Sequence, residues 1–168
     1  INHYTVNKRL HSNDAYTPDE RADMRPDRAT IVYSNILKEL YPDVPVVLGG
    51  IEASLRRVTH YDYWDDKLHK SILVDTKADM LVYGMGEKPL IKLVNELGKG
   101  KNIDQLHDIP QTAFLISKNQ LLENPYKEEA RLYSHEECLQ DKLKQATNFR
   151  TVEEQSNKID AARIIQDV

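Results

Sequence analysis

Two short apolar runs that each end at glycines constrain the fold of this 168-residue chain more than any other feature. Residues 44–48 lead into Gly49-Gly50, and residues 78–83 lead into Gly84-Met85-Gly86. A short apolar run without strict alternation is typical of a strand that is covered on both faces. Each group of glycines predicts a sharp turn at the end of its strand.

The segments beside these runs carry helical patterns. Residues 27–41 place apolar side chains at three- and four-residue steps, with Asp27 as the predicted cap and Pro42 as the stop. Another helix is predicted with Pro89 in its first turn and Gly98 at its end. The remaining predicted elements are helices at residues 65–74, 135–148 and 151–167, a strand at 112–116, and at most a short helix near residues 4–10.

The middle of the chain therefore alternates between helices and strands. Such alternation predicts parallel strands joined by right-handed crossovers. We expect an α/β fold with a three-layer, Rossmann-like (flavodoxin-like or cobalamin-binding-like) parallel sheet, incomplete, and with a helical C-terminal extension. The predicted organisation is an irregular segment at 1–26, the α/β core at 27–118, and a charged, mostly helical connector at 119–168.

Three strands make a small sheet, and the chain begins at Ile1 in the middle of a polar pattern. We therefore expect a piece of a longer protein whose preceding residues add strands to the sheet. An open sheet edge presents unpaired backbone groups. We expect this edge to pair with another chain, which would form a homo-oligomer, or to be covered by a terminal segment.

Charge and cysteine content bear on the partners and the compartment. The net charge of −4 argues against a nucleic-acid partner, because nucleic-acid-binding domains are normally basic. No apolar stretch reaches the length of a transmembrane helix, so no membrane partner is expected. Cys138 is the only cysteine, which excludes an internal disulfide and fits a reducing, cytoplasmic location.

The turn at Gly49-Gly50 has two interpretations. Glycines let backbone N–H groups approach a ligand closely, and open α/β sheets bind ligands beyond the ends of their strands. Alternatively, the turn is only a tight strand exit that needs positive φ. We predict that Gly49→Val disturbs this turn, because a β-branched residue tolerates positive φ badly.

The second glycine turn resembles a dinucleotide-binding fingerprint only in part. Pro89 replaces the third glycine of that pattern, which disfavours binding of NAD or FAD. A glutamate at the start of a helix, such as Glu87, is also favourable simply through the helix dipole. Because both turns follow neighbouring strands, we expect them side by side, with Glu52 and Glu87 flanking one crevice.

The segment after the first turn is dense in unlike polar groups. Arg56, Arg57 and His60 are candidate contacts for a phosphate or a carboxylate of a substrate, with Glu52 and Glu87 orienting them. The alternative is a solvated turn in which the arginines form ion pairs with Glu52, Asp62 or Asp65. The spacing leaves both interpretations open.

The aromatic run from Tyr61 to Trp64 either stacks on a planar ligand or another domain, or packs into the core. We expect the whole stretch to fold over the two glycine turns. The candidate ligand-facing residues are Gly49, Gly50, Glu52, Ser54, Arg56, Arg57, His60, Tyr61, Asp62, Tyr63, Trp64, Gly84, Gly86 and Glu87.

Neither a metal site nor a catalytic residue is predicted. The six histidines do not fall at ligand spacing with a cysteine or a carboxylate pair on a predicted helix. A nucleophile elbow and a Walker A lysine loop are both absent from the sequence.

Several longer motifs resemble the YgiQ family of radical S-adenosylmethionine proteins. They are Ile1-Asn2-His3-Tyr4-Thr5, Asp14-Ala15-Tyr16-Thr17-Pro18, Arg25-Pro26-Asp27-Arg28-Ala29-Thr30, Gly49-Gly50-Ile51-Glu52-Ala53-Ser54-Leu55-Arg56-Arg57, His60-Tyr61-Asp62-Tyr63-Trp64 and the segment from Asp79 to Glu87. The resemblance covers nearly the whole chain and weakens after about Pro125. These motifs are long and unusual in composition, which makes a chance match improbable.

The resemblance implies a longer enzyme. Members of this family have a cobalamin-binding-like Rossmann domain followed by a radical S-adenosylmethionine barrel, whose CxxxCxxC motif holds a [4Fe–4S] cluster. This chain would be the later part of the first domain plus the connector, and its implied partner is its own downstream barrel. The resemblance does not identify the substrate.

The resemblance does not assign the implied cofactors to residues of this segment. A cluster held by protein thiolates needs several cysteines, and this chain has only Cys138. The Asp-x-His-x-x-Gly pattern that ligates cobalamin is absent, which leaves cobalamin binding without its usual ligand. We expect an accessory domain of a radical S-adenosylmethionine iron–sulfur enzyme that is inactive alone. The alternatives are a module that binds a nucleotide or a corrinoid without chemistry, and a domain-docking module.

Overall fold

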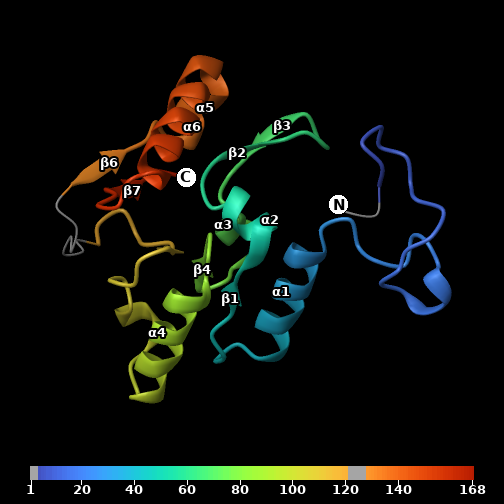
Figure 1. Ribbon diagram of the computed structural model, residues 1–168, viewed down its shortest axis with the longest axis horizontal. Coiled ribbons are helices and arrows are strands. Elements are labelled where there is room, and N and C mark those ends of the chain that lie inside the picture. Colours follow the sequence, from blue (N-terminus) through green and yellow to red (C-terminus); the bar gives the residue numbers. More distant parts are fainter. Residues whose placement is uncertain (1–3, 121–127) are drawn as a thin grey trace.

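The computed structural model describes residues 4–120 and 128–168 (Figure 1). Its central sheet has three strands in the order β1-β4-β5: β1 (Val47–Leu48), β4 (Met80–Val82) and β5 (Thr112–Ala113). β1 and β4 are parallel, which confirms the predicted pairing of the two apolar runs. β5 is antiparallel to β4, so the sheet is mixed.

The expectation of a third parallel strand is therefore wrong, and the segment after α4 (Glu87–Gly98) explains why. A parallel strand would have to start directly at the far end of this helix. Instead, the following residues run back along the same face of the sheet through η2 (Ile103–Gln105) and bury Leu106 and Ile109. They bring Thr112 beside Val82 at the carboxyl end of β4. From there the chain can only continue toward the amino end of β4, which makes β5 antiparallel to it.

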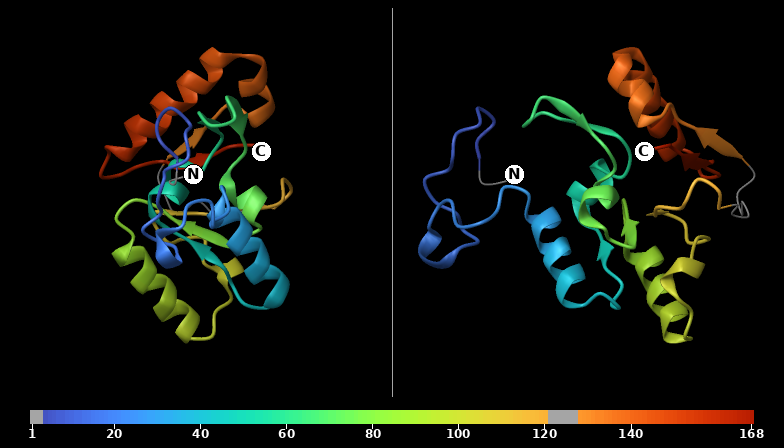
Figure 2. Two further views of the ribbon diagram at one scale, coloured as in Figure 1. Left: turned by 90° about the vertical axis from the view of Figure 1, so that its right-hand side faces the viewer. Right: turned by 180° about the vertical axis from the view of Figure 1, so that it is seen from behind.

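Helices lie on both sides of the sheet (Figures 1 and 2). On one side are α1 (Ala29–Leu40), α2 (Gly50–Leu55) and α3 (Ile72–Thr76), and α4 lies on the other. One apolar cluster contains Leu48, Ala53, Ile72, Leu73, Ala78 and Leu81, and a second contains Met80, Leu93, Ile103, Leu106 and Ile109. Because β4 contributes to both clusters, its continuous apolar run follows from burial on both faces.

Several predicted boundaries shift by a few residues. α1 ends at Leu40, before Pro42 as expected, but its N-cap is Arg28 rather than Asp27 and forms no side-chain cap bond. β1 covers only the last part of the apolar run predicted as a strand. The short helix α2 follows the first glycine turn, where no helix was predicted.

The helix predicted at residues 65–74 is wrong. An antiparallel hairpin stands there instead, formed by β2 (His60–Asp62) and β3 (Lys67–His69), and only the end of the segment enters α3. Asp66 in the hairpin turn has a positive φ of 55°, which a helix does not allow. Ion pairs of Asp62 and Asp65, described below, hold this turn in place of helical hydrogen bonds.

The N-terminal segment is irregular in its described part. The helix considered near residues 4–10 is not formed, and Tyr4 and Leu10 make an isolated antiparallel bridge instead. A single 3₁₀ turn, η1 (Pro18–Glu20), follows. The buried carboxylate of Asp14 accepts hydrogen bonds from the Arg25 guanidinium at 2.6 and 2.9 Å, which stabilises this loop.

The C-terminal part contains more than helices. It consists of β6 (Glu129–Arg131), α5 (His135–Gln140), α6 (Lys142–Ser156) and β7 (Arg163–Ile165). β6 and β7 pair in parallel, so the helix predicted for residues 151–167 is correct only in its first part. Residues 121–127 of the predicted connector lie outside the described residues. None of the helices in the described ranges combines the length and apolar character that a membrane span requires.

Candidate functional site: the glycine edge of the sheet

The two glycine turns lie at the same edge of the sheet, as predicted, because they follow two adjacent parallel strands. The Ser54 hydroxyl connects them: it accepts a hydrogen bond from Gly84 N at 3.1 Å and donates one to Gly50 O at 2.8 Å. We call residues 49–55 and 84–86 together the glycine edge.

The backbone conformations at the glycine edge correct one prediction. Gly49 is extended, with φ at −154°, and an added Cβ would come no closer than 3.9 Å to Val82 O. The argument for disruption by Gly49→Val is therefore wrong, since Gly49 only continues the strand as the N-cap of α2. The positive φ values occur at Gly50 (+85°) and Gly84 (+68°). At Gly84, an added Cβ would also lie 3.1 Å from Gln111 Nε2.

The surface of the glycine edge is apolar. Ile51 and Leu55, one helical turn apart on α2, are 81% and 69% exposed, and Met85 in the neighbouring turn is 78% exposed. Ala53, on the opposite face of α2, is fully buried against the sheet. Three large apolar side chains thus project from an edge that the sequence suggested would be a polar crevice.

Arg56 takes part in ion pairs rather than facing a ligand. Its guanidinium lies 3.3 Å from Glu52 Oε1 and 3.3 Å from Asp62 Oδ2. Arg28 at the start of α1 approaches the same Asp62 oxygen at 2.9 Å and also pairs with Asp65. Of the two interpretations of the sequence, Arg56 therefore follows the one in which the arginines form ion pairs.

Asp62 is the centre of this charged network. Its side chain is only 3% exposed. Burial alone would raise its pKa, but the hydrogen bonds from Arg28 and Trp64 N, together with the charges of Arg28 and Arg56, outweigh burial and lower the pKa. Asp62 is therefore held as a carboxylate that joins the hairpin to α1 and α2.

Arg57 lies close to the glycine edge. Its guanidinium stands over the Tyr83 ring, 4.7 Å from the centroid, and donates a hydrogen bond to Ser54 O. Burial raises the pKa of Tyr83, and the nearby charge of Arg57 partly opposes that rise. The aromatic contact and the backbone hydrogen bond orient Arg57 along the turn.

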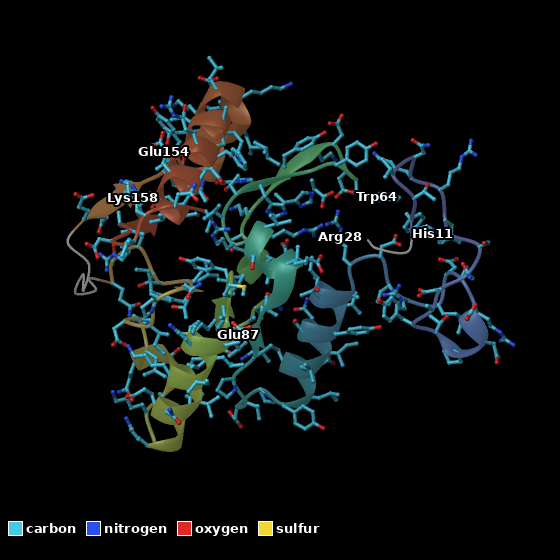
Figure 3. The ribbon with its side chains drawn as sticks, in the orientation of Figure 1. His11, Arg28, Trp64, Glu87, Glu154 and Lys158 are labelled. Carbon is cyan, nitrogen blue, oxygen red and sulfur yellow. The ribbon has the colours of Figure 1, made fainter. Side chains whose placement is uncertain are left out.

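The remaining predicted residues of the hairpin make their contacts within the hairpin and with the N-terminal segment. His60 stacks on His69 with ring centroids 5.9 Å apart, and burial lowers its pKa. The Tyr61 hydroxyl donates to Asp66 Oδ1 at 2.6 Å. Trp64 lies against the Tyr4 ring of the N-terminal segment, far along the hairpin (Figure 3). None of these contacts involves the glycine turns, so the folding of this stretch over them stays a prediction.

Tyr63 and the two predicted glutamates also have separate surroundings. The Tyr63 hydroxyl donates to the Val6 carbonyl at 3.3 Å. Glu52 turns toward α1, where it accepts a 2.6 Å hydrogen bond from the Thr30 hydroxyl. Glu87 begins α4 on the other side of the sheet (Figure 3). The two carboxylates therefore do not flank one crevice.

Sequence reasoning missed one group of possible metal ligands. Oxygens of Asp62 and Asp65 and a ring nitrogen of His69 lie within 4.8 Å of one another. The predicted helix began at Asp65 and left out Asp62, which the hairpin brings beside Asp65 and His69. Arg28 and Arg56 already supply positive charge to these carboxylates, so the arrangement is that of an ion-pair network.

Comparison with known proteins identifies the family. The sequence profile described as Radical SAM N-terminal matches residues 1–168. A UPF0313 protein of Porphyromonas gingivalis is 58% identical over the whole chain, which covers 26% of that protein. A UPF0313 protein of Bacteroides thetaiotaomicron is 56% identical, again over the whole chain and 28% of the relative. The UPF0313 protein YgiQ of Escherichia coli is 53% identical over 118 residues, 70% of this chain and 16% of that protein.

No solved structure matches the chain. The chain spans about a quarter of the length of the first two of these relatives. The match of the profile over all residues and the high identities agree with the motifs of the N-terminal segment and the glycine edge. The chain belongs to the Radical SAM N-terminal family.

Proposed function

We propose that this chain is the accessory N-terminal part of a longer radical S-adenosylmethionine enzyme, and that the glycine edge docks against the remainder of that enzyme. Family membership over the whole chain and the much greater length of the relatives support the first part. The exposure of Ile51, Leu55 and Met85 on one edge carries the second. Exposed apolar patches on a folded protein mark interaction surfaces.

A [4Fe–4S] cluster does not fit the donor groups of this chain. Cys138 is its only thiol, and that thiol is buried in the C-terminal part, where it accepts a hydrogen bond from Asn148 Nδ2 at 3.1 Å. Burial raises its pKa, which disfavours the thiolate needed for iron. The cluster and S-adenosylmethionine are therefore assigned to parts of the parent protein outside residues 1–168.

The geometry supports docking better than ligand binding at this edge. Arg56 and Glu52 already satisfy each other, and α2 is only six residues long. Arg57, beside the Tyr83 ring, brings a positive charge to the apolar edge. In this arrangement the glycine edge supports or covers the site where the parent enzyme binds its substrate, and Arg57 is the residue placed to contact an anionic group there.

Cysteine accessibility in the full-length protein tests the docking proposal. Met85→Cys and Leu55→Cys are compared with Val94→Cys on α4, which is 58% exposed. A thiol-alkylating reagent is followed by mass spectrometry of each peptide. At the glycine edge we expect modification to be slower by at least about tenfold, because an interface excludes solvent and reagent. Equal rates at all three positions would refute docking.

A charge introduced at the same edge tests its importance for activity. We expect Leu55→Asp combined with Met85→Asp to reduce reductive cleavage of S-adenosylmethionine by the reconstituted full-length enzyme. Val94→Asp is the matched control and should keep the activity. Activity that is preserved in the double variant would show that docking of this edge does not support catalysis.

A further inference from the structure

The outer edge of β1 has no strand partner among the described residues, because β1 stands at the end of the strand order. Met80 N donates to Val46 O at 3.5 Å, and Asp79 N donates to the same carbonyl at 3.0 Å. Alternate residues of a parallel strand direct their backbone groups to the same neighbour. Val47, between the residues that face β4, therefore directs its N–H and C=O toward the open side.

An apolar hollow adjoins this open edge. It has a volume of about 230 Å³ and is lined by Leu37, Tyr41, Val44, Pro45, Val46 and Val47. Every lining residue is apolar or aromatic, so the hollow offers no charged group for an anion or a metal ion. The occupant that fits this chemistry is an apolar side chain carried on a backbone that pairs with Val47.

The outer face of α1 extends the same apolar surface. Ile36 is 45% exposed and Leu40 is 64% exposed, and they lie one turn apart on the helix. The stripe that predicted α1 from sequence is thus wider than the surface that α3 and the sheet cover. A helix with apolar residues left on its outer face normally packs against a further element.

We propose that the β1 edge and this hollow seat a β-strand from the same polypeptide, supplied by the part that lies outside residues 1–168. About three quarters of the length of the relatives lies outside the matched region, so the parent chain has ample sequence for such a strand. The strand extends the sheet beyond β1 and inserts an apolar side chain between Leu37 and Val44.

A segment of the same chain suits this edge better than a second copy of the protein. β1 is only two residues long and Pro45 precedes it, so few hydrogen bonds are available to hold a separate molecule. A covalently connected strand has an effective concentration of about millimolar, so it can bind through few contacts. This inference concerns sheet completion and does not depend on the chemistry of the parent enzyme.

Photo-crosslinking in the full-length protein identifies the occupant. The photoreactive amino acid benzoylphenylalanine replaces Tyr41, which lines the hollow and is 56% exposed. The control places it at Tyr61, which is 55% exposed on the hairpin. We expect Tyr41 to crosslink within one molecule to a peptide outside residues 1–168, with Tyr61 not capturing that peptide. Crosslinks at Tyr41 only between two copies, or no crosslink there, would overturn the proposal.

Hydrogen exchange of the Val47 amide gives a second readout that needs no substitution. If a strand pairs with β1, we expect this amide in the full-length protein to exchange at least about 100-fold more slowly than an unprotected amide. Exchange at the unprotected rate would overturn the proposal even if the crosslink forms, because the occupant would then not be paired as a strand.

Discussion

The strand β4 and the β2–β3 hairpin show two different ways of holding a short strand in place. All three residues of β4 are apolar and buried, with Leu81 in the cluster on one face of the sheet and Met80 in the cluster on the other. In the hairpin, Asp62 is the buried strand residue, and its carboxylate meets Arg28 and Arg56. β4 is stabilised by burial that any neighbouring apolar surface can provide, whereas the hairpin needs particular partners.

This difference decides what can be predicted. The hydrophobic effect is non-directional, so an apolar run indicates burial before its neighbours are known. An ion pair depends on where its partner lies, and Arg28 is 34 residues from Asp62 in sequence. Four experiments test this difference between apolar burial at β4 and ion pairing in the hairpin. They are given from the largest expected effect to the smallest.

Leu81→Ala should cause the largest loss of stability. Leu81 is fully buried at the centre of β4, and removing it leaves a cavity. We expect the free energy of unfolding to fall by about 3–5 kcal/mol, measured by urea unfolding. Leu90→Ala on α4, where the side chain is 49% exposed, is the control and should cost less than about 1 kcal/mol. Similar costs for the two variants would contradict the view that β4 is the apolar centre.

Asp62→Asn should destabilise the protein by about 3 kcal/mol, because it leaves two partly buried guanidinium groups without their shared carboxylate. The amide keeps the volume of the side chain and can still accept from Trp64 N. Asp66→Asn in the exposed turn is the matched control, with an expected change within about 0.5 kcal/mol. If Asp62→Asn is as harmless as this control, the hairpin is not anchored by charge.

Gly84→Ala should cost about 1–2 kcal/mol, because an L-residue is strained at positive φ. The added methyl group also approaches Gln111, whose flexible side chain has to shift. Gly49→Ala, with its extended backbone, should change the unfolding free energy by less than about 0.5 kcal/mol. The opposite ranking would show that the first glycine of the edge is the constrained one.

The pH dependence of stability should be small and should arise in part from His60 in the hairpin, since burial also lowers the pKa of His135 in α5. Burial lowers the pKa of His60 from its ordinary value of 6.5, so the unfolded chain binds a proton more readily than the folded one. Stability is therefore complete above that ordinary value and is lost as the pH falls through the lower pKa of the folded state.

Urea unfolding between about pH 5 and pH 8 measures this effect. His60→Gln should reduce the slope of the profile and leave the contribution of His135, whereas His11→Gln at an exposed position should not change the slope. A profile that is identical in the His60 variant and the unmodified protein would remove His60 as its cause.

The helical stripe of α1 and the apolar runs of β1 and β4 were predictable, because burial leaves a periodic pattern in the sequence. The placement of the two glycine turns at the same edge of the sheet was also predictable, because both turns follow adjacent parallel strands. The direction of β5 was not predictable, because it depends on how residues 99–111 pack back against the sheet. The hairpin was hidden because Leu68, Ile72 and Leu73 also fit a helical stripe.

The candidate site was predictable only in location. Sequence placed Gly50 and Gly84 at one edge, but it did not show that Ile51, Leu55 and Met85 would form the exposed surface there. Apolar residues in a short helix normally indicate burial. Which of them face outward depends on the side of α2 that rests on the sheet, where Ala53 is enclosed.

The sequence by itself determined the α/β class, the pairing of the two apolar strands and the family, because these depend on local periodicity and contiguous motifs. Tertiary structure alone decided the reversed third strand, the charged anchoring of the hairpin and the apolar character of the glycine edge. These features arise where residues distant in the chain meet. The energy of such contacts depends on geometry that local sequence does not encode.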